Sequence, residues 1–511
     1  MQPPALARLL CCAALAATCV GQLPAAAQDA VPAAPQPLAP VANDDRWFGA
    51  VQAIAAPQAA LNAGVRWTRL IFPWEEIQPN RTGEFRPGYF SEAEIDAHLA
   101  LGIEIVGITL YTPGWAARDP RHGARSVPSN LSLPIDHPEN YWASYVRQLV
   151  GHYRGRIDTW VFYNEPDMYV EPDDFRTFAG TPADYSLVLK TAYLAAKSAN
   201  PNAKVVMAGF TYWWDKEAGR PQYFQRVLDA IGADPTAAEN SWFFDVVTAH
   251  TYGNPLNSYT VPTVFRRIMR EKGIDKPIWI IESNVLVKND PRVGSGEGPF
   301  RATLDEQASH VIQSMALARA AGVQRYSTYK IVDEHPENGD EYWGLTRNDG
   351  TVRPSYLAYQ VGARYLQHTR AATYYWAGSQ VPPTEPEVSA LLASNVNRFQ
   401  WPWPAPVNVV VLEREAERVT VIWNASPQPV QFVLPARSSA AQLVDKYGPT
   451  TPLAARDGNY TLSLEPSRNN SDPRDPTLYL VGGSPWIIVE DVPAVIVPVP
   501  TLTPHPPPSR T

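Results

Sequence analysis

Two glutamates each end a short apolar run, and these positions make them the residues best suited to chemistry. Glu165 is the middle residue of an Asn-Glu-Pro tripeptide that directly follows the apolar residues 159–163. Proline removes a backbone donor and biases the preceding residue toward extended geometry, so we expect Glu165 to project from the end of a strand. Glu282 ends the apolar run 277–281. A charged group there is costly unless it faces a polar cavity or a partner.

A facing pair of such carboxyl groups, about 5 Å apart, suits a double displacement at an acetal carbon. One carboxylate attacks the anomeric carbon, and the other carboxyl group protonates the leaving oxygen and then activates water. Like-charge repulsion raises the pKa of one member of such a pair. Each residue also has a structural interpretation: an exposed strand-end glutamate for Glu165, and a buried ion pair with a barrel arginine for Glu282. Because each of the two strand ends carries a glutamate and the pair suits one reaction, we favour Glu165 as acid/base and Glu282 as nucleophile.

The elements that would position these residues follow a regular rhythm from residue 44 to about residue 367. Short apolar runs alternate with helical patterns, which is typical of βαβ units around a parallel sheet. We expect strands at residues 47–51, 67–72, 103–110, 159–163, 204–209, 243–250, 277–282 and 324–331. Helices are expected at 92–101, 140–153, 183–198, 223–231, 261–272 and 304–321. Eight strands in this order predict a (β/α)8 TIM barrel over residues 44–370, with the working groups at the C-terminal ends of its strands.

The next part of the chain has a different texture, because strand patterns follow one another from residue 374 to 488 and we expect no helix there. The predicted strands are 407–412, 418–423, 430–434, 442–446, 460–464 and 477–481. Residues 460, 462 and 464 alternate with polar neighbours, as in a half-buried antiparallel strand. We therefore predict an accessory all-β sandwich over residues 371–491.

Both ends of the chain read as segments outside the folded domains. Arg8 precedes the apolar residues 9–20 and an Ala-Ala-Ala cleavage site, which predicts a signal peptide over 1–27 and a secreted, periplasmic or cell-surface protein. The apolar stretch is too short for a transmembrane helix. All three cysteines lie inside it, so the exported chain is expected to lack disulfides. An Ala/Pro-rich spacer at 28–43 and a Pro-rich disordered tail at 492–511 complete the predicted organisation.

Several function classes find no support in the composition. The formal charge is −8 and no basic run is present, so nucleic acid is not an expected ligand. The sequence contains no His-Glu-x-x-His, no Gly-x-Ser-x-Gly and no phosphate-binding loop. No metal or cofactor is expected, since the paired-carboxylate chemistry needs none. The glycine-rich residues 294–298 are interpreted as a loop beside the cleft.

With Asn-Glu-Pro after the fourth strand and a glutamate ending the seventh, residues 44–366 resemble glycoside hydrolase clan A. Arg69 resembles the strand-two arginine of that clan, which implies a hydrogen bond to the nucleophile. Asn164 resembles the asparagine that binds the sugar 2-hydroxyl. His250 and Tyr252 resemble the strand-six histidine and tyrosine near the substrate and the nucleophile. Residues 69–79 and 111–116 are most similar to family 39 of this clan.

Each implied role has a physical basis and a structural alternative. Arg69 would keep Glu282 ionised, because a nearby cation lowers a carboxylate pKa, although it could equally serve as an ordinary interior ion pair. Tyr252 can donate to the nucleophile and orient it. His250 is one of nine histidines, and a single histidine is often a satisfied structural group. We favour a site role because His250 shares its strand end with Tyr252.

Five tryptophans fall at or just after predicted strand ends, where an aromatic face could stack on a sugar ring. They are Trp74, Trp115, Trp213, Trp214 and Trp343. The alternative for each is a place in the core. Trp213 and Trp214 are adjacent, so in an extended chain only one of them can face the cleft. We expect Trp115 and Trp343 to bind substrate.

These observations together predict a secreted retaining glycoside hydrolase that cleaves a polysaccharide or oligosaccharide. Export, the accessory domain and the scattered rim aromatics favour endo action. One alternative is a catalytically silent barrel that binds or scaffolds carbohydrate, against which the complete set of Glu165, Glu282, Arg69 and Tyr252 argues. Another is a transglycosylase, because a sugar can intercept the same glycosyl-enzyme.

Overall fold

The computed structural model describes residues 34–81, 85–86, 90–168, 177–294, 300–333, 342–376, 379, 381–394, 403–468, 470–472 and 475–492. The predicted signal peptide, residues 493–511 of the predicted tail, and residues 295–298 of the glycine-rich run lie outside these ranges. Across the described ranges, none of the helices combines the length and the apolar character needed to cross a bilayer.

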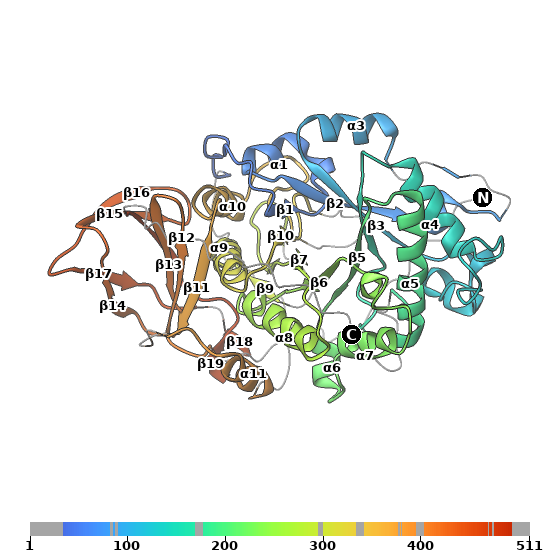
Figure 1. The fold of residues 1–511 in the computed structure, drawn as a ribbon. Coiled ribbons are helices and arrows are strands. Elements are labelled where there is room, and N and C mark those ends of the chain that lie inside the picture. The colour runs from blue at the N-terminus through green and yellow to red at the C-terminus, as the bar shows by residue number, and fades with distance from the viewer. Residues whose placement is uncertain are drawn as a thin grey trace, which may run out of the picture. The chain divides into compact units, whose positions relative to one another are not determined.

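Eight parallel strands close into a barrel with helices around it, which confirms the predicted (β/α)8 fold (Figure 1). The strands are β1 (Phe48–Ala50), β2 (Trp67–Pro73), β3 (Glu104–Leu110), β4 (Thr159–Phe162), β5 (Lys204–Phe210), β6 (Val246–His250), β7 (Ile278–Glu282) and β10 (Arg325–Thr328). Their order around the barrel is β1-β10-β7-β6-β5-β4-β3-β2. Each expected strand overlaps one of these, because a strand covered on both faces reads as a continuous apolar run.

The described helices around the barrel include the six that the sequence predicts and four others. They are α1 (Pro57–Ala63), α2 (Trp74–Ile77), α3 (Glu92–Ala100), α4 (Tyr141–His152), α5 (Pro182–Ala199), α6 (Trp213–Glu217), α7 (Tyr223–Gly232), α8 (Asn257–Glu271), α9 (Leu304–Ala320) and α10 (Pro354–Tyr365). Of the four others, α10 is as long as α4. Helices α3, α5 and α9 each begin with a capping box. Helix α8 begins four residues before the expected start and contains Pro262 in its interior.

The C-terminal part of the chain forms antiparallel sheets, as predicted. Six strands are ordered β11 (Ala371–Trp376), β12 (Val407–Glu413), β13 (Glu417–Asn424), β20 (Trp486–Asp491), β15 (Ala440–Asp445) and β16 (Thr450–Ala454). The pair β14 (Val430–Pro435) and β17 (Asn459–Leu464) shares an apolar core with this sheet through residues such as Ile422 and Leu462. Short pairs are formed by β8 (Leu286–Val287) with β9 (Arg301–Ala302), and by β18 (Asn470–Asp472) with β19 (Asp475–Tyr479).

Two expectations for the regions outside the barrel need correction. The stretch expected to be free of helices contains α11 (Glu385–Ser394), whose start is capped by Thr384. The Ala/Pro-rich segment expected as a spacer packs against the protein from residue 34 onward. The Leu38 backbone exchanges two hydrogen bonds with the Gln360 side chain on α10, and Val41 is buried.

The antiparallel sheet packs directly on the barrel through α9. Lys446, at the end of β15, is buried, and its ammonium lies 2.7 Å from the Asp305 carboxylate and 2.9 Å from the Ser309 hydroxyl. Gln313 on the same helix donates to the Gly483 carbonyl at 2.8 Å. The contact is also apolar, because α9 residues such as Met315 share a buried cluster with Val410 of β12.

Candidate active site

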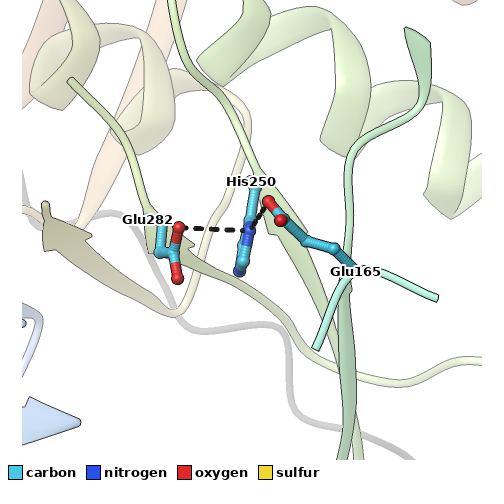
Figure 2. Close-up of side chains that lie close together, drawn as sticks. All are labelled: Glu165, His250 and Glu282. Atoms are coloured by element: carbon cyan, nitrogen blue, oxygen red, sulfur yellow. Dashed lines mark hydrogen bonds and ion pairs between the residues drawn. The ribbon is translucent and has the colours of Figure 1, made fainter. Parts of the chain in front are cut away.

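Glu165, His250 and Glu282 come from different barrel strands and point toward one another (Figure 2). Glu282 is the last residue of β7, His250 is the last residue of β6, and Glu165 closely follows β4. His250 Nδ1 lies 2.6 Å from Glu165 Oε1 and 3.3 Å from Glu282 Oε2. One polar atom of each side chain lies within 4.8 Å of the other two. Nearest oxygens this close are compatible with the pair at about 5 Å that a double displacement uses.

Glu282 is held as a carboxylate by two neighbours. Its side chain is 6 % exposed; Arg69 Nη2 donates to Oε1, and the Tyr252 hydroxyl donates to Oε2 at 2.5 Å. Burial by itself raises the pKa of Glu282, but the charge of Arg69, then His250 and the Tyr252 hydrogen bond, lower it, and the net pKa lies below its ordinary value. The residue is therefore ionised at neutral pH, as a nucleophile requires.

Replacing Arg69 by methionine is expected to expose how strongly Glu282 depends on this ion pair. In the wild type the pKa of Glu282 is lower in the folded state, so its ionisation stabilises the fold above its unfolded pKa, and this contribution is lost as pH falls through the folded pKa. Without the guanidinium, burial raises that pKa instead. We expect Arg69→Met to lower the free energy of unfolding by about 3–5 kcal/mol at pH 7.

The loss is expected to be smaller at pH 4 than at pH 7, and the acidic limb of kcat/KM is expected to move to higher pH. Urea unfolding at both pH values and a pH–rate profile provide the measurements. Arg46→Met is the control, because its pair with Glu104 is exposed and worth about 1 kcal/mol at most. An unchanged acidic limb in Arg69→Met would contradict this assignment.

The backbone at Glu165 differs from the expectation. Its φ is 40°, in the left-handed region, whereas the sequence predicted extended geometry before Pro166. Proline disfavours only the right-handed helical region at the preceding residue. In this left-handed conformation the Glu165 amide donates to the Gly209 carbonyl on β5 at 3.2 Å. The side chain is 16 % exposed, more than that of Glu282, which suits the partner that exchanges protons with the leaving group and with water.

His250 is buried between the two glutamates and occupies space that Gly209 leaves open. A Cβ at position 209 would overlap Nε2 and Cδ2 of the imidazole. Within the described ranges Nε2 has no hydrogen-bond partner, so the polar contacts of this ring are those of Nδ1 with the glutamates. The hydrogen bond between Nδ1 and Glu165 Oε1 fixes the position of that carboxyl group.

We expect Gly209→Ala to displace the imidazole and to lower kcat/KM about 10²-fold, since misplacing a catalytic group by about 1 Å costs that much. Gly151→Ala on α4 is the matched control, because an added Cβ meets only Ala199 at an ordinary 3.9 Å. Steady-state kinetics and thermal unfolding of both variants give the result. Wild-type kinetics in a folded Gly209→Ala protein would show that the position of His250 is unimportant.

Asn164 lies beside the same arginine. Arg69 Nη1 is 3.4 Å from Asn164 Oδ1, so one guanidinium contacts both the predicted nucleophile and the predicted ligand of the sugar 2-hydroxyl. The Asn164 carbonyl accepts a hydrogen bond from Thr177 Oγ1. The structure thus brings five of the six predicted polar residues into direct contact, and Asn164 joins them through Arg69.

Trp343 is the predicted aromatic that packs against a residue of the site, Tyr252. Its ring packs edge-on against Tyr252, with centroids 5.2 Å apart, and against Tyr329 at 6.0 Å. The Trp343 carbonyl accepts from the Asn284 side chain at 2.7 Å. Trp343 is thus linked to Glu282 through Tyr252.

The other four tryptophans differ from this pattern. Trp74 is buried in the core between Trp142 and Tyr145, so it takes the structural alternative. Trp115 is partly exposed and packs edge-on against Trp74, and among the described residues no contact joins it to either glutamate. Trp213 and Trp214 lie on the short helix α6, so the argument from an extended chain does not apply to them.

A buried ion network that the sequence did not reveal holds the loop around Trp343. Arg353 pairs with Asp333 at 2.7 Å and with Asp290 at 2.9 Å, and all three side chains are buried. Arg353 Nη1 also donates to the Gly344 carbonyl, and the Gly344 amide donates to Asp333. No sequence spacing signals this network, because Asp290 and Asp333 follow different strands and meet only in the folded barrel.

Glu165, His250 and Glu282 are of residue types that bind metal ions. One ligand atom of each lies within 4.8 Å of the others, which is close enough to share an ion. Both oxygens of Glu282 already accept from Arg69 and Tyr252. A guanidinium against a carboxylate opposes a cation at the same oxygens. The donor set therefore favours an ion-paired carboxylate over a metal ligand.

Comparison with known proteins relates this architecture to glycosidases. A family 39 glycoside hydrolase from Bacteroides cellulosilyticus superposes with a TM-score of 0.59 at 16 % identity, over 89 % of this chain and 82 % of that one. A family 30 subfamily 8 xylanase from Clostridium acetobutylicum gives 0.53 at 16 % identity, over 88 % and 96 %. A monomeric β-xylosidase from Caulobacter crescentus gives 0.50 at 14 % identity, over 89 % and 98 %.

No family model and no curated protein matches the chain by sequence. At identities this low, structural similarity establishes the fold and not the activity. The predicted resemblance to clan A glycoside hydrolases is thus confirmed at the level of the fold, and the function has to be argued from the site.

Proposed function

We propose that this protein is a retaining glycoside hydrolase, exported by its N-terminal signal, in which Glu282 is the nucleophile and Glu165 the acid/base. The observation that carries the proposal is the arrangement at the barrel rim. Two carboxyl groups share His250 within 4.8 Å, and one of them is held ionised by Arg69 and Tyr252. The similar folds of known glycosidases support the same proposal.

The geometry supports a reaction in two steps. Glu165 donates a proton to the glycosidic oxygen while a Glu282 oxygen attacks the anomeric carbon, which releases the leaving group and forms an ester to the enzyme. Ester formation removes the charge of Glu282. Glu165, now a carboxylate, takes a proton from water as the water attacks the same carbon, and the ester breaks with net retention. Arg69 and Tyr252 receive the Glu282 carboxylate again at the end of the cycle.

We propose a polysaccharide or oligosaccharide as the substrate, with cleavage within the chain rather than at its end. Trp343 is 8 % exposed and packs on Tyr252, which binds Glu282, so we propose that its remaining surface borders the bound sugar. Trp115, on the loop after β3, offers a second face farther along the rim. Separate aromatic surfaces are expected where several sugar units bind. Since structural neighbours are named as a xylanase and a β-xylosidase, xylan and β-xylosides are the first compounds to test.

The test is a panel of 4-nitrophenyl α- and β-glycosides together with xylan and other plant and bacterial polysaccharides. Wild-type protein is expected to hydrolyse at least one of them, and Glu282→Ala to hydrolyse none. Proton NMR of the first product formed is expected to show the anomeric configuration of the substrate. Binding of glycans without turnover by both proteins would instead support the silent carbohydrate-binding barrel. Products longer than the substrate would support the transglycosylase.

A further inference from the structure

Asp167 lies two residues after Glu165 and is a buried carboxyl group that the two-step reaction does not use. Its side chain accepts three hydrogen bonds at Oδ2: from Thr211 N at 2.7 Å, Thr211 Oγ1 at 3.0 Å and Tyr212 N at 3.2 Å. Thr211 directly follows β5. The residue is 3 % exposed. Asp167 therefore ties the turn after β4 to the end of the neighbouring strand.

A second tie lies on the other side of the same turn, where the Glu165 amide donates to the Gly209 carbonyl at 3.2 Å. Between the two ties the backbone is strained, with φ of 40° at Glu165, and Tyr212 across the junction has φ of 70°. Left-handed backbone at such residues costs on the order of 1 kcal/mol and persists only where the surroundings impose it. The two ties to the end of β5 are among the contacts that hold this turn.

The surroundings of Asp167 make a purely stabilising role a poor explanation. The pKa of Asp167 is raised to about 7, mainly by burial and also by the charges of Glu165 and Asp215, although the Thr211 hydrogen bonds oppose the rise. Tyr223 on α7 also faces it. In the part of the chain that the structure describes, Oδ1 has no hydrogen-bond partner. A carboxyl group with this desolvation cost is typical of functional sites.

We propose that Asp167 is a positioning residue for Glu165, which holds the Asn-Glu-Pro turn against the end of β5 and so keeps the Glu165 carboxyl group beside His250. The inference rests on the proposed function, because it assigns Asp167 to the acid/base half of that reaction. The role of Asp167 thus differs from that of Arg69 and Tyr252, which bind the nucleophile Glu282.

Leaving-group dependence tests this role. Protonation matters for a poor leaving group and little for 2,4-dinitrophenolate, so the test compares phenyl and 2,4-dinitrophenyl glycosides of the sugar that the wild type accepts. Asp167→Ala is expected to lower kcat/KM about 10²-fold on the phenyl glycoside, as a misplaced catalytic group would, with little change on the dinitrophenyl glycoside. Asp167→Asn keeps an acceptor oxygen for Thr211 and Tyr212, so it is expected to restore most of the rate. Equal losses on both substrates would overturn the proposal.

The matched control is Asp245→Ala, since Asp245 accepts from Val205 N at the opposite end of β5. It is expected to show the same leaving-group dependence as the wild type. A readout without turnover is amide hydrogen exchange in peptides that contain Glu165 and Thr211. Asp167→Ala is expected to speed exchange in both peptides and Asp245→Ala in neither. Unchanged exchange at Glu165 would overturn the inference even if the wild type hydrolysed no glycoside, whereas that lack of hydrolysis alone would refute only the proposed function.

Discussion

Glu282→Gln is expected to lower kcat by at least about 10⁴-fold, because no other group can form the ester once the nucleophilic carboxylate is gone. Glutamine keeps the size of the side chain and an oxygen that can accept from Arg69, so the fold is expected to survive. Steady-state kinetics on the best substrate of the panel, with thermal unfolding as a check on the fold, gives the result. Because glutamine does not ionise, the pH profile of this variant does not report on position 282, and the rate is the quantity to compare.

The control for this variant is Glu104→Gln. Glu104 begins β3 at the opposite end of the barrel and pairs with Arg46 and Arg325. It is expected to keep wild-type turnover. A folded Glu282→Gln protein with a tenth or more of the wild-type rate would exclude Glu282 as the nucleophile.

Glu165→Ala is expected to give the second-largest effect, and one that depends on the substrate. Loss of general acid catalysis is expected to lower kcat/KM by about 10²–10⁴-fold on glycosides with poor leaving groups. A 2,4-dinitrophenyl glycoside needs no protonation, so its kcat/KM is expected to change little. Its kcat is expected to fall, because hydrolysis of the ester still needs Glu165 as base.

Adding azide to the Glu165→Ala assay tests whether the lost function is that of the general base. Azide is a nucleophile that needs no general base, so it is expected to restore kcat in Glu165→Ala and to yield a glycosyl azide with the substrate's anomeric configuration. Glu239→Ala, at an exposed position, is the control and is expected to behave as the wild type. Equal loss of kcat/KM for good and poor leaving groups, with no effect of azide, would remove Glu165 from the acid/base role.

The barrel could be predicted because its strands are buried on both faces. Such strands read as uninterrupted apolar runs, and a charged residue that ends one, as Glu282 does, is conspicuous. Arg69 and His250 could be predicted as site residues for the same reason, since each lies on or at the end of a predicted strand. Their mutual contacts follow from the closure of the barrel, which brings the ends of β2, β6 and β7 to one rim.

Features that depend on packing across the fold could not be predicted in this way. The Glu165 amide bonds to the carbonyl of Gly209 on β5, and Asp167 bonds to the amides of Thr211 and Tyr212, which directly follow β5. Trp74 and Trp343 both fall after strand ends, and only their neighbours separate a core residue from one beside the site. Periodicity alone carries no such information.

Helix α11 was missed for a compositional reason. Pro382, Pro383 and Pro386 surround its start, and proline-rich sequence indicates a loop. Pro386 falls in the first helical turn, however, where proline is tolerated because its missing N–H has no partner within the helix. The capping interaction between Thr384 and Glu387 was the signal that could have located this helix.

The most direct test of the double displacement is to trap its intermediate. A 2,4-dinitrophenyl 2-deoxy-2-fluoroglycoside of the accepted sugar forms the ester quickly, and the fluorine slows its hydrolysis. Digestion and mass spectrometry are then expected to find one fluoroglycosyl group per chain, attached to the peptide that contains Glu282, and none in Glu282→Gln. A label on another residue, or an inverted product without any label, would contradict the mechanism proposed for this site.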